Sequence, residues 1–170
     1  MDISWMIQQL TTHGASITQL CSTVSQADAR VKPNPQAWSI LEVINHLYDE
    51  EREDFRQRLD LTLHQPETEW PAIDPEAWVT SRAYQQRDLQ QSIANFAAER
   101  KRSIEWLHTL RDPDWSRLRT HPSGFALRAG DLLSAWVAHD VLHLRQLVEL
   151  HYHLVTLQAA PYAVEYAGDW

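Results

Sequence analysis

Apolar residues recur at intervals of three, four and seven along four long segments, and this periodicity restricts the fold more than any other feature of the chain. The spacing places the apolar side chains of each segment on one face of an α-helix. The first segment runs from about Ile3 to about Ser25, and the fourth runs from Asp131, its expected N-cap, to about Leu154. Only four glycines and short β-branched runs occur, which favours helix over strand.

The second helix has the clearest start signal in the chain. Ser39-Ile-Leu-Glu42 matches a capping box, in which the hydroxyl and the carboxylate each accept a hydrogen bond from the other residue's backbone amide. Trp38 precedes the cap and is placed to pack on Val43 as a hydrophobic staple. We expect this helix to run to about Leu63, with its direction of entry held by the cap.

A long stretch without helical periodicity separates the second helix from the third. It runs from His64 to about Arg87 and contains three prolines and two tryptophans. Connections of this length usually carry function or short structure of their own, so we expect an ordered crossover held down by its tryptophans. The third helix is expected to run from a cap at about Asp88 to a stop at Asp112-Pro113.

Two shorter stretches complete the chain. Residues 115–130 contain one proline and two glycines, which predicts a loop or a small hairpin. The last sixteen residues, 155–170, carry no pattern that assigns them a structure. Four amphipathic helices, with one long crossover between the second and the third, predict an all-α four-helix bundle formed by residues 1–170 as one domain.

The charge balance and the single cysteine limit the classes of partner and compartment. A net charge of −8 without a basic cluster argues against binding to nucleic acid or to an anionic membrane surface. No run of about 18 apolar residues could span a membrane, and polar residues interrupt the stretch where a signal peptide would lie. With Cys21 as the only cysteine, no intramolecular disulfide or cysteine-based zinc site can form, and a cytoplasmic protein is expected.

Two histidines four residues apart, His139 and His143, lie in the proline-free run of the fourth helix. On a helix this spacing places both imidazoles on one face, which Trp136 and Gln146 share and which is expected to point towards the core. Buried imidazoles need partners, and either a metal ion or hydrogen bonds within the core would supply them. The residue after His139 is Asp140, so the pair does not form the HExxH motif of zinc proteases.

His46 is the best candidate for a third ligand, because two imidazoles alone make a weak metal site. On a helical wheel it lies at the edge of the apolar stripe of the second helix, with acidic residues around it. One interpretation is a solvated acidic face that contains a histidine. The other is the polar wall of a site, in which Glu50, one turn away, is an accessory ligand or accepts a hydrogen bond from a ligand.

Other residues that could carry chemistry have simpler interpretations. Arg128 and Arg145 could meet an anionic group of a substrate, but surface charge is the simpler role for each. The remaining histidines are expected at surface positions, in loops or at a helix end: His13, His64, His108, His121, His151 and His153. No nucleophile elbow, P-loop or dinucleotide fingerprint occurs in the sequence.

Two motifs on two helices are specific when they are taken together. The first is Trp38-Ser-Ile-Leu-Glu-Val-Ile-Asn-His46-Leu-Tyr-Asp-Glu50-Glu, and the second is Ala138-His139-Asp-Val-Leu-His143-Leu-Arg-Gln146-Leu. With these motifs, the chain resembles the DinB-like (DinB/YfiT-like) superfamily over nearly its whole length. The resemblance implies a divalent metal held by His46, His139 and His143, with coordination positions left open. Imidazole ligation favours nickel or zinc, with iron or manganese as alternatives.

The resemblance also implies an enzyme that uses its metal to activate a small molecule. Relatives of known activity depend on thiols: maleylpyruvate isomerases use mycothiol, and S-transferases use bacillithiol or mycothiol. A metal lowers the pKa of such a thiol and yields a nucleophile at neutral pH. We therefore expect an S-transferase, isomerase or hydrolase type of enzyme that activates a low-molecular-weight thiol or water and acts on a small-molecule substrate. Glu50, Asp140 and Gln146 are the expected neighbours of the metal ligands or of the substrate.

Two other kinds of function stay open beside the enzyme. The same site would suit a metal-binding or stress-response protein with no reaction of its own. A third alternative is a bundle whose three histidines are only hydrogen-bonded. The sequence leaves the oligomeric state open as well; relatives are often homodimers, and eight tryptophans would suit such an interface.

Overall fold

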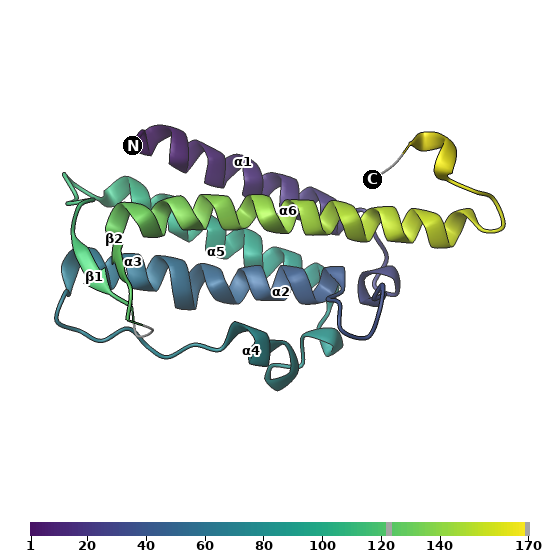
Figure 1. The fold of residues 1–170 in the computed structure, drawn as a ribbon, viewed down its shortest axis with the longest axis horizontal. Helices are drawn as coiled ribbons and strands as arrows, with labels where there is room; N and C mark the ends of the chain where they lie inside the picture. Colours follow the sequence, from purple (N-terminus) through teal and green to yellow (C-terminus); the bar gives the residue numbers. More distant parts are fainter. Residues whose placement is uncertain (122–123, 169–170) are drawn as a thin grey trace.

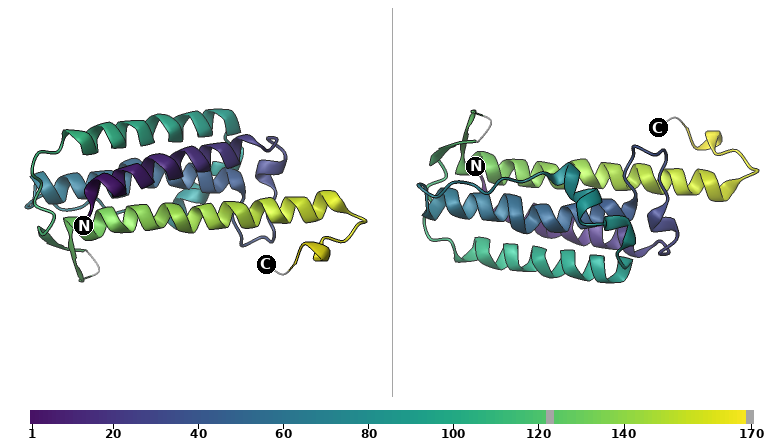
Figure 2. Two further views of the ribbon diagram at one scale, coloured as in Figure 1. Left: turned by 90° about the horizontal axis from the view of Figure 1, so that it is seen from above. Right: turned by 90° about the horizontal axis from the view of Figure 1, so that it is seen from below.

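The chain forms a four-helix bundle, as the sequence predicts (Figure 1). A computed structural model describes residues 1–121 and 124–168. The second long helix of the bundle is made of two α-helices joined by a π-helical turn, Glu51–Phe55. The helical segments of the bundle are α1 (Ile3–Ser22), α2 (Ile40–Glu50), α3 (Arg56–His64), α5 (Leu89–Thr109) and α6 (Ala129–Ala159). Seen from above, α1 lies between α5 and α6 (Figure 2, left).

Local capping explains where most of these helices begin. The backbone N–H of Ser39 donates to the Glu42 carboxylate over 2.8 Å, and the N–H of Glu42 donates to the Ser39 hydroxyl over 3.2 Å. These two hydrogen bonds confirm the predicted capping box of α2. The side chain of Asp88 accepts from the N–H of Gln91 and caps α5, also as predicted.

The prediction that Asp131 is the N-cap of the fourth helix is wrong, because the helix begins a few residues earlier. Helix α6 begins at Ala129, and Asp131 lies in its first turn, where its carboxylate accepts from the N–H of Arg128 over 2.8 Å. The earlier start is possible because carbonyl groups of the preceding segment accept the first free N–H groups of the helix. The N–H of Ala129 donates to Arg117 and that of Gly130 donates to Trp115, each over 2.9 Å.

Two helix ends also differ from the prediction. Helix α1 ends at Ser22, before the expected Ser25, where the hydroxyl and N–H of Thr23 both donate to the carbonyl of Leu20. Helix α6 continues past the expected Leu154 to Ala159. Past Ala159, the described part of the chain holds only one further helical turn, Glu165–Ala167.

The crossover between α3 and α5 is ordered and carries short structure, as expected. It contains α4 (Pro75–Ser81) and a 3₁₀ turn (Tyr84–Gln86), and it runs along the outer side of α2 (Figure 2, right). Two aromatic side chains of the crossover are buried, Trp70 and Tyr84. The Tyr84 hydroxyl donates to Asp49 on α2 over 2.6 Å and so ties the crossover to the bundle.

A small antiparallel hairpin precedes α6, in the segment for which a loop or hairpin is predicted. It pairs β1 (Leu118–Thr120) with β2 (Ala126–Arg128), with Leu118 opposite Arg128. Residues 122–123 of this segment lie outside the described residues.

The apolar core is divided into two clusters by buried polar side chains near the middle of the bundle. One cluster gathers around Ile17, Ile44 and Phe96, and the other around Leu10, Leu59 and Trp136. Buried charged residues, among them Arg100, occupy positions between the two clusters along the helices. No helix in the described part of the chain is long and apolar enough to cross a membrane.

Candidate metal centre

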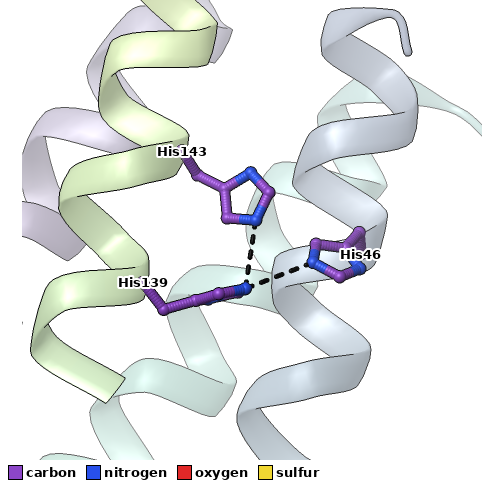
Figure 3. A group of neighbouring side chains, drawn as sticks. All are labelled: His46, His139 and His143. Carbon is purple, nitrogen blue, oxygen red and sulfur yellow. Dashed lines mark hydrogen bonds between the residues drawn. The ribbon is translucent and has the colours of Figure 1, made fainter. Parts of the chain in front are cut away.

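Three histidine side chains from two helices meet between α2 and α6 (Figure 3). His46 comes from α2, and His139 and His143 come from successive turns of α6. The Nε2 atom of His139 lies 3.1 Å from Nε2 of His143 and 3.4 Å from Nε2 of His46. One possible ligand atom from each ring falls within 4.8 Å of the other two. The structure therefore brings together all three residues that the sequence predicts as ligands.

Aromatic side chains surround the three rings and limit their access to water. Trp38, next to the cap of α2, packs its ring on His46 with 4.7 Å between centroids. The ring centroid of Phe55, at the end of the π-helical turn, lies 5.0 Å from that of His139. His46 is buried, with 5% of its surface exposed, and His139 and His143 are half-buried. The rings are therefore partly shielded from solvent between the two helices.

Burial keeps all three imidazoles neutral at neutral pH. It lowers the pKa of His46 to about 3, with repulsion from His143 adding to the effect. It also lowers the pKa of His139 to about 2, with further repulsion from the two other histidines. Burial lowers the pKa of His143 as well. Neutral imidazole is the form that binds a metal, since its unprotonated nitrogen carries a free lone pair.

A neighbouring amide sets the tautomer of His143. The Nδ1 atom of His143 lies 2.7 Å from the Oε1 atom of Gln146, and an amide oxygen can only accept a hydrogen bond. The proton therefore lies on Nδ1, and the Nε2 lone pair faces His139 and His46. Such outer hydrogen bonds typically orient metal-ligating histidines. The prediction that Gln146 adjoins the ligands agrees with this geometry.

The donor set fits a divalent metal better than it fits a hydrogen-bonded core. Three neutral rings point Nε2 atoms at one another, and a proton on Nε2 of His139 is the single donor that can serve both short contacts. One proton shared over 3.1 and 3.4 Å leaves the cluster weakly bonded for its degree of burial. A cation at the same point would accept a lone pair from each ring.

A buried carboxyl pair lies beside the cluster. An oxygen of Glu50 is 4.0 Å from Nε2 of His139, and the Glu50 side chain is hydrogen-bonded to Asp54 one turn further on. Burial raises the pKa of Glu50 to about 8, and the carboxyl of Asp54 adds to the rise. Glu50 can therefore hold a proton next to the cluster near neutral pH. Sequence reasoning identified Glu50 and missed Asp54.

The carboxyl pair continues into a polar chain that leads to the hairpin. The guanidinium of Arg58 lies 2.9 Å from Asp54 through Nε and 3.4 Å from Nε2 of His121 through Nη1. His121, for which a surface or loop position is predicted, lies in the loop of the hairpin, where it contacts Trp70 and stacks on Phe125. Nothing local in the sequence links these residues, because Arg58 and His121 are 63 positions apart.

Asp140, expected near the ligands or the substrate, faces away from the cluster. Its carboxylate receives two hydrogen bonds from Arg100, over 2.7 and 2.8 Å, and it is fully buried. Arg100 also donates twice to Glu51, over 2.8 Å each, and once to the carbonyl of Leu10. Successive residues on a helix point in different directions, so His139 reaches the cluster while Asp140 reaches the interior on the side of α1 and α5.

The remaining candidates lie away from the cluster. Arg128 is exposed and pairs with Asp131, and Arg145 is exposed and pairs with Glu149, which agrees with the surface role assigned to both. None of the other histidines of the described chain belongs to the group of three. Of the six, His13 is half-buried near Asp140, and His151 lies 3.1 Å from the carbonyl of Leu20.

Comparisons with known proteins agree with this architecture. YfiT from Bacillus subtilis has 22% sequence identity to this chain, and the match covers 89% of this chain and 87% of YfiT with a TM-score of 0.79. YfiT is described as a probable metal-dependent hydrolase with an unusual four-helix bundle topology. No curated protein matches this sequence. The sequence model of the DinB superfamily matches residues 9–147, and the chain therefore belongs to the DinB superfamily.

Proposed function

We propose that this protein is a metal-dependent enzyme in which His46, His139 and His143 hold one divalent cation. The observation that carries the proposal is the convergence of three neutral imidazole nitrogens within 4.8 Å, from two helices whose N-terminal ends are held by capping hydrogen bonds. Nickel or zinc suits such a ligand set best, with iron or manganese as alternatives. Three ligands leave coordination positions free, which is typical of catalytic rather than structural sites.

The reaction we propose is activation of water or of a low-molecular-weight thiol for attack on a small-molecule substrate. A cation in this site would act as a Lewis acid and lower the pKa of a water or thiol beside it. The carboxyl of Glu50 lies next to His139 and is shielded from solvent, and a cation in the site would favour its ionised form, which can accept the released proton. Trp38 and Phe55 exclude water from the two sides of the cluster that they cover.

Two reaction types use the same residues. The description of YfiT as a probable metal-dependent hydrolase supports activation of water. The thiol-dependent relatives that the two histidine motifs resemble support activation of a thiol. A metal-binding protein without a reaction of its own is the alternative that the turnover experiment below separates from both.

Metal content is the first test. The protein, purified without a histidine tag and loaded with nickel or zinc, is expected to retain about one equivalent by elemental analysis. His139→Ala should retain far less, whereas His153→Ala, a change on the same helix outside the cluster, should retain as much as the wild type. If the wild type holds well below one equivalent of metal and His139→Ala holds the same amount, the proposed metal site is wrong.

Turnover is the second test. The loaded protein is incubated with monochlorobimane and a set of low-molecular-weight thiols, and in parallel with a panel of activated esters and amides. We expect turnover in one of the two assays that exceeds a His46→Ala control. A fully loaded protein that matches this control in both assays would support the non-catalytic alternative.

A further inference from the structure

A groove of about 460 Å³ opens next to the histidine cluster, and neither the family nor the proposed chemistry assigns it a role. It lies between the segment that precedes α2, residues 33–38, and residues 146–153 of α6. Its volume falls within the range of about 300–1,000 Å³ that is typical of small-molecule sites. The groove is therefore large enough for a ring and a few substituents.

Two side chains belong both to the wall of the groove and to the surroundings of the cluster. Trp38 lines the groove and packs on His46. Gln146 lines the groove and bonds to Nδ1 of His143. A substrate bound in the groove would therefore lie beside the side chains that border the cluster, and its reacting atom would reach the cluster past Trp38 and Gln146. None of the three histidines lines the groove itself.

The wall formed by residues 33–38 is held in place by hydrogen bonds. The side-chain oxygen of Asn34 accepts from the N–H groups of Gln36 and Ala37, over 3.0 and 2.9 Å. The capping box then fixes the chain at Ser39, whose hydroxyl also accepts from Gln85 of the crossover over 2.8 Å. A ligand would meet a preformed wall and would lose little free energy in ordering it.

The lining favours a flat, uncharged group. Trp38 contributes an aromatic side chain from the segment before α2, and Tyr152 and Leu150 contribute an aromatic and an apolar side chain from α6. The acidic side chain of the lining is Glu149, whose partner Arg145 is 73% exposed and does not line the groove. A carboxylate or phosphate on the bound group would be repelled by Glu149 and, of the described lining side chains, only the imidazole of His153 could pair with it, whereas an uncharged aromatic ring would stack without that repulsion.

We propose that this groove is the substrate subsite of the enzyme and binds an uncharged aromatic or similarly flat group next to the reacting atom. The inference rests on the proposed metal site, because the reacting atom is taken to lie at the cluster. It adds a substrate class that the histidine cluster does not specify.

Binding of matched thiols to the cobalt(II)-loaded full-length protein tests the subsite. Three probes share a thiol anchor: phenylmethanethiol carries a neutral ring, 2-mercaptoethanol carries no ring, and 4-(mercaptomethyl)benzoate carries an anionic ring. Each is titrated while the sulfur-to-cobalt absorption band is recorded. We expect the neutral ring to bind at least about tenfold more tightly than 2-mercaptoethanol, and more tightly than the anionic ring.

Two pairs of variants test whether the tighter binding of the neutral ring depends on the groove. Tyr152→Ser should reduce the advantage of the neutral ring to below about threefold and leave the affinity for 2-mercaptoethanol unchanged. Tyr162→Ser makes the same change at an exposed position outside the groove and should keep the full advantage. Glu149→Gln should reduce the difference in affinity between the probe with the neutral ring and the probe with the anionic ring. Glu105→Gln, which breaks the comparable i,i+4 pair with Lys101 on α5, should leave that difference as it is.

The outcomes separate the subsite from the metal site. Cobalt binding with equal affinities for the three probes, or equal effects of the two tyrosine variants, would overturn the subsite and leave the metal site intact. If cobalt does not bind, or if His139→Ala binds as much cobalt as the wild type, the metal site is overturned and the subsite with it.

Discussion

His143 shows how one side chain depends on a neighbour for its chemistry. Its distance from His139 places its Nε2 atom in the cluster, but the hydrogen bond to Gln146 decides that this atom carries a lone pair rather than a proton. The pair is local, three residues apart on one helix, and a sequence pattern can suggest it. Neutrality is not local, because burial among other segments lowers the pKa of each ring.

Replacing Gln146 tests the tautomer directly. Gln146→Leu removes the acceptor for Nδ1 of His143, and we expect metal affinity to fall about 10- to 100-fold because the ring loses its orientation. Gln158→Leu, the same change at an exposed position near the end of α6, should leave the affinity as it is. Competition with a chromophoric chelator measures both. Equal affinities in the two variants would contradict the role of Gln146.

The lowered pKa values predict how the metal-free protein responds to acid. His46 and His139 titrate at about 3 and about 2 in the folded chain, whereas unfolded histidine titrates near its ordinary value of about 6.5. Between those values the unfolded state binds more protons, so the free energy of unfolding should fall as the pH drops from about 6.5 towards 3. Each histidine should contribute at most about 1.4 kcal/mol per pH unit.

Denaturant unfolding of the metal-free protein at pH 7, 5.5 and 4 measures this fall. His139→Gln removes one of the three histidines whose pKa burial lowers and should make the fall shallower, while His64→Gln, at a half-exposed site on α3, should not. The metal-loaded protein should release its ion only where protons can compete for the imidazoles, near the lowered pKa values or where acid unfolds the chain. An ion that stays bound to the acid-unfolded chain would contradict ligation by three histidines.

At the scale of elements, α2 is the helix that the sequence describes best and the one that carries most of the unexpected detail. Its capping box fixes where it starts and so fixes the height of His46 in the bundle. Further along, the π-helical turn Glu51–Phe55 places Phe55 against His139. Two adjacent residues therefore point to different sides of the helix: Glu50 faces the histidine cluster, and Glu51 pairs with Arg100. π-helical turns are rare and often occur at functional sites.

Loss of the cap should therefore affect both stability and metal binding. Ser39→Ala is expected to reduce the free energy of unfolding by about 1 kcal/mol and to weaken metal binding, because α2 carries a ligand two turns from the cap. Asp2→Ala removes the N-cap of α1, which holds no ligand. This control should cost stability and leave metal affinity unchanged. If Ser39→Ala loses stability but binds the metal as tightly as the wild type, the cap does not contribute to the metal site.

At the scale of the whole molecule, one buried guanidinium joins segments from all four helices. Arg100 on α5 donates to Asp140 on α6, to Glu51 in the π-helical turn and to the carbonyl of Leu10 on α1. Trp136 of α6 adds a 3.0 Å hydrogen bond to the same Glu51. The network lies directly behind the cluster, since each of its carboxylates is next in sequence to a residue that faces the cluster.

Breaking this network should be costly. Arg100→Met leaves Glu51 and Asp140 buried without a counter-charge, and we expect a loss of about 3–5 kcal/mol in the free energy of unfolding. Lys101→Met, next in the chain but exposed, should change stability by less than about 0.5 kcal/mol. Chemical denaturation compares the two. A loss below about 1 kcal/mol for Arg100→Met would show that the carboxylates find other partners or take up protons.

Helical periodicity, the capping residues Ser39 and Asp88 and the i,i+4 spacing of His139 and His143 are all local, so the sequence alone predicts the four helices, the long crossover and the shared face of the two histidines. That His46 joins them is implied by the family resemblance and by no local pattern, because it lies 93 positions from His139. Their physical basis is the geometry of a single helix, which needs no knowledge of the neighbours. The start of α6, the partner of Asp140, the π-helical turn and the groove beside Trp38 depend instead on which segments pack together. Asp140, for example, bonds to Arg100, which is 40 positions away, and Arg100 bonds to the carbonyl of Leu10, 90 positions away, and a local pattern contains no record of such partners.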